Sequence, residues 1–271
     1  MTGTADLQSL LQSIRFVYGY DFTEYAQASV ARRVDHYIKV NKIGGIQELG
    51  RVLLGNEKSF AHFVQEFTVN VTEMFRDPSF YISLRAKVMK RLATYPFVKI
   101  WIAGCSTGEE VYSMAILLKE EGLLDRSVIY ATDINQKALH AAKAGIFRLD
   151  LMQKYTANYQ KAGGKNAFSD YYVAKYDSAL LDKSLREKIV FSPHNLAVDT
   201  SFNEFQLILC RNVLIYFNQG LQNKVISLFY ESLCPFGILG LGSKESLLFS
   251  DKQKCFGDID HREKIFIKER Q

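Results

Sequence analysis

The sequence predicts a doubly wound α/β sheet with an antiparallel edge, a small all-helical N-terminal domain and a small β-rich insertion. Apolar residues recur at helical spacing before residue 70, apolar runs alternate with helical patterns from Val98 onward, and residues 147–186 interrupt that alternation. The expected parts are a helical domain over residues 1–69, a linker and connecting helix over 70–92, and an α/β domain over 93–271.

Short amphipathic helices are expected in the first 69 residues. Their apolar positions recur every three or four residues, as in Leu7, Leu10, Leu11 and Ile14, then Val30, Val34, Tyr37 and Ile38, then Phe60, Phe63, Val64 and Phe67. Gly44-Gly45 and Gly55-Asn56 separate these helices. Asp77-Pro78 begins a further helix that is expected to run to about Leu92.

Apolar runs and helical patterns alternate in the rest of the chain. Strands are expected at 98–103, 127–132, 188–192, 205–210, 236–241 and 263–268, and helices near 109–121, 135–144 and 219–233. This order favours a mostly parallel sheet. Because no clear long helix separates the last two runs, they are expected to form an antiparallel pair at the sheet edge.

Residues 147–186 contain Gly163-Gly164 and several aromatic residues, a composition compatible with a small hairpin insertion. A docking surface and a simple elaboration of the surface are both open interpretations.

Composition narrows the class of protein. The chain has 271 residues, 48% of them hydrophobic, four widely spaced cysteines and a net charge of +5. The start lacks the features of a signal peptide, and no apolar run approaches the roughly 20 residues that cross a bilayer. We therefore expect a reduced, cytoplasmic protein with no metal site and no membrane insertion. The charge is too small to require a nucleic-acid partner.

A glycine turn between a strand and a helix is the most informative motif. Residues 103–110 read Ala-Gly-Cys-Ser-Thr-Gly-Glu-Glu, and this order places backbone amides where a nucleotide-like ligand can lie. Asp133 ends the next strand, where a ribose would offer two hydroxyls. Only Gly104 and Gly108 are present, which disfavours a dinucleotide. Glu110 begins the helix and either contacts a cationic ligand group or merely complements the helix dipole.

The segment joining the two domains has an unusual composition for a linker. Residues 70–78 place an amide, a hydroxyl, an aromatic ring and a guanidinium close together, which is typical of segments that line a cleft. Arg76 either holds a carboxylate through paired hydrogen bonds or forms a salt bridge with a nearby acid.

Two later strands also end in polar residues. Arg211 and Asn212 follow the strand at 205–210, whose carboxyl end should face the ligand crevice. Tyr216 either orients a substrate oxygen or is a core tyrosine. Asn195 and Leu196 follow another strand and suit the recognition of adenine.

A basic stretch lies within the second expected helix. Arg32, Arg33, Lys39 and Lys42 accompany a single acid, Asp35. The stretch either meets an acidic protein surface or is an ordinary solvated helix face.

Together these motifs resemble the chemotaxis receptor methyltransferases of the CheR type. Asn-x-Thr-x-x-Phe-Arg, Gly-Cys-Ser-Thr-Gly-Glu-Glu, Ala-Thr-Asp-Ile, Asn-Leu and Cys-Arg-Asn-Val-Leu-Ile-Tyr-Phe occur in the family's order, and the resemblance covers nearly the whole chain. It implies a Rossmann-like methyltransferase sheet and transfer of a methyl group from S-adenosylmethionine to glutamates on the cytoplasmic helices of chemoreceptors. Arg32, Arg33 and the insertion would then recognise the receptor.

The resemblance also implies a role for each motif residue. Asn70, Thr72 and Arg76 would approach the methionine part of the cofactor, Gly104 and Gly108 would form the turn beneath it, Glu110 would help to hold it, Asp133 would bind the ribose, Asn195 and Leu196 would border the adenine, Arg211 and Asn212 would complete the pocket, and Arg76 and Tyr216 would lie nearest the transferred methyl. The family usually has a second aromatic residue where this chain has Met74.

Two other functions compete with this one. A noncatalytic module would keep the cofactor fold but transfer nothing, and the intact motif residues argue against it. A nucleic-acid methyltransferase is disfavoured because the chain lacks an Asn/Asp-Pro-Pro-Tyr/Phe segment and because Cys234-Pro235 has the wrong order for a Pro-Cys nucleophile.

Overall fold

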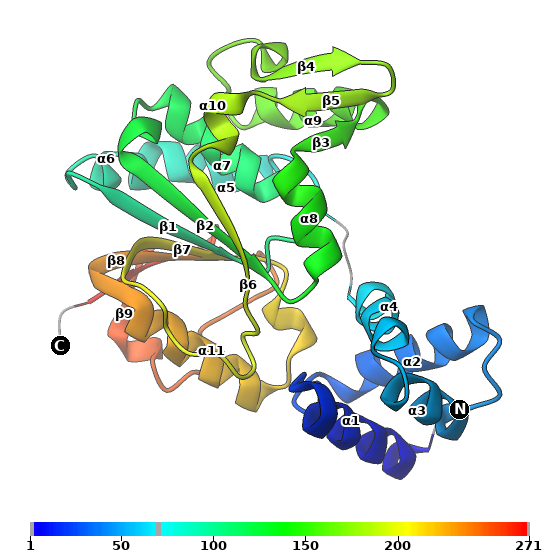
Figure 1. The fold of residues 1–271 in the computed structure, drawn as a ribbon. Helices are drawn as coiled ribbons and strands as arrows, with labels where there is room; N and C mark the ends of the chain where they lie inside the picture. Colours follow the sequence, from blue (N-terminus) through cyan, green and yellow to red (C-terminus); the bar gives the residue numbers. More distant parts are fainter. Residues whose placement is uncertain (1–2, 69–71, 270–271) are drawn as a thin grey trace.

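The structure is a computed structural model that describes residues 3–68 and 72–269. A seven-stranded sheet lies between layers of helices, a helical domain packs at one end of it, and a three-stranded antiparallel sheet lies beyond the helices of one layer, at the top of the view (Figure 1). The predicted fold class is therefore confirmed, including the antiparallel edge and the small β-rich element.

The N-terminal part consists of helices α1 (Thr4–Tyr18), α2 (Gln27–Val40), α3 (Ile46–Leu54) and α4 (Glu57–Phe67). They enclose a core of their own that includes Ile14, Val34 and Phe63. The helices are separated where the glycines predicted a break, and the side chain of Asn56 caps α4 by accepting hydrogen bonds from two amides of its first turn.

The central sheet has the strand order β6-β2-β1-β7-β8-β10-β9. Its strands are β1 (Val98–Ala103), β2 (Ser127–Asp133), β6 (Ile189–Pro193), β7 (Phe205–Cys210), β8 (Leu233–Leu241), β9 (Phe256–Asp260) and β10 (Ile265–Lys268). The first five in spatial order run parallel, so their carboxyl ends meet at one edge. The order changes direction between β1 and β7, and ligands bind at such a switch point in open α/β sheets.

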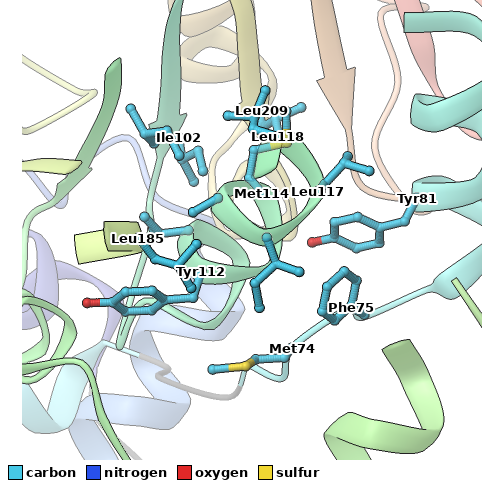
Figure 2. Close-up of a cluster of buried hydrophobic side chains, with 14 of the residues drawn as sticks. Met74, Phe75, Tyr81, Ile102, Tyr112, Met114, Leu117, Leu118, Leu185 and Leu209 are labelled. Carbon is cyan, nitrogen blue, oxygen red and sulfur yellow. The ribbon is translucent and has the colours of Figure 1, made fainter. Parts of the chain in front are cut away.

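Side chains of β1 alternate between two cores. Ile100 and Ile102 face the core beneath α7 (Glu109–Glu120), and Trp101 faces the core beneath α11 (Gln219–Ser232). Helix α8 (Gln136–Ala144) follows β2. Figure 2 shows Met74 and Phe75 packed below α7 in the first of these cores. Met74 is fully buried, so the position fills the core although it carries no ring.

The connecting helix runs without a break from Pro78 to Leu92, as the sequence predicts. It comprises α5 (Pro78–Ser83), a π-helical turn (Leu84–Val88) and α6 (Met89–Leu92). The π-helical turn buries Leu84 and Val88, and apolar periodicity does not distinguish one such turn from the α-helix around it.

The carboxyl-terminal end contains one strand that the sequence did not predict. Strands β8 and β10 pair antiparallel as expected. Beyond them lies β9, which pairs with β10 and forms the edge of the sheet.

The insertion contains strands β3 (Ile146–Arg148), β4 (Tyr172–Lys175) and β5 (Ser178–Leu181). It also contains two helices that the hairpin prediction did not include, α9 (Leu149–Lys161) and α10 (Lys183–Arg186). The buried carboxylate of Glu120 in α7 accepts hydrogen bonds from Tyr159 and Tyr171, which ties the insertion to the main domain.

Candidate active site

A cavity opens where β1, β2, β6 and β7 end, between the sheet and the helical domain. It is lined by most of the residues that the sequence singled out, namely Thr72, Arg76, Gly104, Glu110, Asp133, Asn195, Leu196, Arg211, Asn212 and Tyr216. Gly108 is not among the lining residues, and Asn70 lies outside the described residues. Motifs that are far apart in the sequence therefore meet in one place.

The glycine turn has three residues with a left-handed backbone. The φ angles are +74° at Gly104, +50° at Ser106 and +95° at Gly108. The Ser106 amide donates a hydrogen bond of 2.8 Å to one oxygen of Asp133, and the Asn135 amide donates one of 2.8 Å to the other. Burial raises the pKa of Asp133 above its ordinary value, and these amides oppose the rise. The turn and the carboxylate thus fix each other's position.

Glycine is needed at positions 104 and 108 for different structural reasons. A Cβ on Gly104 would lie 2.4 Å from Cγ2 of Val213, across the cavity wall. A Cβ on Gly108 would lie 2.9 Å from Cβ of Ala142, so this glycine allows α7 to approach α8 closely.

Replacing Gly104 with alanine should therefore weaken both the fold and ligand binding. The positive φ and the clash with Val213 together should lower the free energy of unfolding by about 1–3 kcal/mol. Thermal unfolding and titration with S-adenosylhomocysteine measure the two effects. Gly122→Ala is the matched control because Gly122 also has positive φ, but nothing lies within 4 Å of its added Cβ. Equal losses of ligand affinity in both variants would contradict the assignment of Gly104 to the site.

Arg211 is the buried ionic centre of the cavity wall. Its side chain is 3% exposed and forms ion pairs of 2.8 Å with both Glu110 and Asp77. It also donates to the carbonyl oxygen of Arg76 at 3.2 Å and lies 4.1 Å from the ring centre of Phe80. Its guanidinium therefore joins the end of β7, the start of α7 and the linker.

The backbone around Arg76 is held in an uncommon conformation. Phe75 and Asp77, which flank it, have φ angles of +52° and +57°. The amide of Phe75 donates to Oγ of Ser113 at 2.9 Å. Non-glycine residues adopt this conformation rarely, and it concentrates at functional sites. The linker thereby presents the Arg76 side chain to the cavity.

The helical domain completes the cavity. Tyr25, Arg33 and Phe67 line it, and the guanidinium of Arg33 lies 4.6 Å from the ring centre of Tyr216. Arg33 is half-buried, whereas its neighbour Arg32 is exposed. Arg33 therefore lines this cavity, whereas Arg32 is not among its lining residues.

Direct contacts fix this docking of the helical domain. The Ala26 amide donates to the carbonyl oxygen of Tyr216 at 2.9 Å, and the Asn218 amide donates to that of Glu24 at 2.9 Å. The ring of Tyr25 packs edge-on against Phe217 at 4.9 Å. Tyr25 carried no sequence signal, since its position in the cavity depends on contacts across 192 residues of chain.

The groups present fit S-adenosylmethionine. Glu110 offers a carboxylate to an ammonium group, and Asp133 offers one to a pair of ribose hydroxyls. Leu196 and Phe67 supply apolar surface for a purine ring. The left-handed glycine turn lets backbone approach the ligand without an intervening Cβ.

In the described ranges, no helix is long and apolar enough to cross a membrane.

Two family models match this chain, one in each of its two main parts. Residues 70–264 match the family described as CheR methyltransferase, SAM binding domain, and residues 5–68 match the CheR methyltransferase all-alpha domain. The chain is 47% identical to the Pseudomonas putida protein Cher3 over 263 residues, covering 97% of this chain and 96% of that one. It is 32% identical to chemotaxis protein methyltransferase 1 of Vibrio cholerae, with 82% of each chain covered. The chain therefore belongs to the CheR methyltransferase family and is an S-adenosylmethionine-dependent methyltransferase.

Proposed function

We propose that this enzyme methylates glutamate side chains on the cytoplasmic helices of chemoreceptors, and that the resulting methyl esters set sensory adaptation. The observation that carries the proposal is the pairing of a cofactor-type cavity with two arginines in its lining, Arg33 from the helical domain and Arg76 from the linker. Cationic side chains in the lining of such a cavity favour an anionic acceptor. The naming of relatives as chemotaxis protein methyltransferases supports the same acceptor class.

The chemistry requires little of the protein beyond positioning. A glutamate carboxylate is already ionised at neutral pH, so no strong general base is needed. Bound S-adenosylmethionine supplies an electrophilic methyl group. Charge is lost as the anionic acceptor and the cationic donor react, so a site poor in water favours the transfer.

Each residue has a positioning role in this proposal. Arg76 orients the acceptor carboxylate through its planar guanidinium. Tyr216, held beneath Arg33, orients an acceptor oxygen nearest the methyl group. Glu110 binds the ammonium group of the cofactor, Asp133 binds the ribose, and Asn195 and Leu196 border the adenine. Thr72 approaches the methionine part, and Arg211 and Asn212 complete the pocket.

Receptor recognition is assigned to the helical domain, taken as residues 1–69, and to the insertion, taken as residues 147–186. Arg32 is exposed on α2 and is free of the cavity wall, so it suits contact with an acidic helix. Residues 70–92 then connect this domain to the methyltransferase domain over 93–271.

The direct test uses purified enzyme with radiolabelled S-adenosylmethionine and membranes from its own organism. We expect label in a band of chemoreceptor size, released by mild alkali as a carboxyl methyl ester is. Alkali-stable label, or label in nucleic acid, would reject a glutamate ester as the product.

A further inference from the structure

The loop 211–214, which follows β7 and carries residues of the cavity wall, is held by a distant carboxylate. Glu245, in the segment after β8, is 4% exposed. One of its oxygens accepts hydrogen bonds from the amides of Val213 and Leu214, both at 2.8 Å. The other accepts from the amides of Asn212 at 3.1 Å and Gly242 at 2.6 Å.

These contacts answer a structural need of the loop. Residues 212 and 213 follow β7, and Leu214 is the first residue of a short helical turn, so the amides of residues 212–214 have no partners in regular structure. Asn212 has a φ of +61°, a left-handed conformation that the surroundings must maintain. A carboxylate that accepts several amides at once meets both needs, because it satisfies the donors and fixes their relative directions.

The same loop sets the positions of groups on both sides of it. Arg211, the first residue of the loop, forms an ion pair with Glu110. Val213 abuts the glycine turn, since its Cγ2 occupies the space where a Cβ of Gly104 would lie. A shift of the loop would therefore move the ammonium-binding carboxylate and the turn together.

We propose that Glu245 is a positioning residue of the cofactor site, whose carboxylate holds the loop 211–214 in the conformation that aligns Glu110 and the glycine turn. The inference rests on the assignment of this cavity to S-adenosylmethionine and is independent of which acceptor is methylated. Burial raises the pKa of Glu245, and the loop amides oppose the rise, as expected for a buried carboxylate bound by backbone donors.

The test is Glu245→Gln, assayed by calorimetric titration with S-adenosylhomocysteine and by thermal unfolding. The amide keeps the size of the side chain but turns NH2 hydrogens toward two of the four amides, which lose their acceptor. We expect the dissociation constant to rise about 30-fold.

Glu120→Gln is the matched control. Glu120 is also a buried carboxylate, fully covered, that accepts several hydrogen bonds, and it lies at the other end of the helix that begins beside the cavity. Its variant should unfold at a lower temperature but bind S-adenosylhomocysteine within about twofold of the unchanged enzyme. The proposal fails if both variants lose affinity equally, or if Glu245→Gln binds like the unchanged enzyme.

A second variant keeps the test decisive if Glu245→Gln does not fold. An added Cβ at Gly242 would lie 2.8 Å from both the Asn212 amide nitrogen and a carboxylate oxygen of Glu245. Gly242→Ala should therefore separate the carboxylate from the loop without removing charge, and weaken binding about tenfold. Unchanged binding would overturn the proposal. The binding assays contain no receptor, so a failure to methylate receptors would not affect their result. If the unchanged enzyme does not bind S-adenosylhomocysteine, the assignment of the cofactor site itself is rejected.

Discussion

Replacing Arg211 with leucine is expected to lower the free energy of unfolding by about 3–5 kcal/mol. The substitution leaves Glu110, a half-buried carboxylate, without the cation that it contacts at 2.8 Å, and it also removes the contact with Asp77. For a chain of this size the loss corresponds to a fall in melting temperature of about 10 °C. Urea unfolding gives the free energy directly, and titration with S-adenosylhomocysteine should show weaker binding because Glu110 is no longer oriented.

Two further variants separate the ion pair from the packing of the Arg211 side chain. Arg211→Lys keeps a charge but cannot reach both carboxylates with a planar fork, so it should recover only part of the stability. Adding Glu110→Gln to Arg211→Leu should also recover stability, because no unpaired charge remains at Glu110. If the double variant is as unstable as the sum of the two single losses, Arg211 stabilises the site through packing with Phe80 rather than through its charge.

The sequence predicts best those elements whose burial leaves a continuous apolar run in the chain. Strands β1, β2 and β7 are nearly continuous apolar runs because both of their faces are covered, and such runs are visible in the sequence. The residues at the carboxyl ends of these strands are then known from the ends of the runs, so position alone predicts Gly104, Asp133 and Arg211 as site residues. The comparisons confirm the family that these motifs suggested.

Strand β9 and helix α9 differ from the sequence prediction for different reasons. The edge strand β9 reads Phe-Gly-Asp-Ile-Asp and is only partly buried, so it has little apolar content to reveal it. Helix α9 does bury Met152, Tyr155 and Tyr159 at helical spacing. That spacing was available in the sequence, but the glycines and aromatic residues after it suggested a hairpin for the whole insertion.

The roles of several site residues depend on tertiary contacts that the spacing of residues in the sequence cannot reveal. Neighbouring residues Arg32 and Arg33 have the same chemistry in the sequence, yet only Arg33 lines the cavity, because the docking of the helical domain decides which helix face is covered. Gly108 belongs to the motif but serves the packing of two helices. Glu245 has no motif partner near it in the sequence, since the amides that it binds at residues 212–214 lie about 30 residues earlier.

Replacing Arg76 with alanine is expected to lower kcat for receptor methylation by about 10²–10³-fold, the loss typical of removing one oriented donor from an active site. The fold should survive, because two backbone contacts of this segment remain in the variant: the bond from Arg211 to the Arg76 carbonyl oxygen and the bond from the Phe75 amide to Ser113. Initial rates with radiolabelled S-adenosylmethionine and receptor membranes measure the effect. Arg76→Lys should recover little, since an ammonium cannot hold a carboxylate through two parallel bonds.

Asp133→Ala provides the contrast that identifies the role of Arg76. Asp133 is assigned to the ribose, so its loss should raise KM for S-adenosylmethionine about 30-fold and leave kcat at saturating cofactor much closer to the unchanged value. Arg76→Ala should show the opposite division, with a large fall in kcat at saturation. If both variants keep full activity at limiting cofactor, neither residue has its assigned role. If Arg76→Ala changes only KM for the cofactor, Arg76 binds the methionine part of S-adenosylmethionine and does not orient the acceptor.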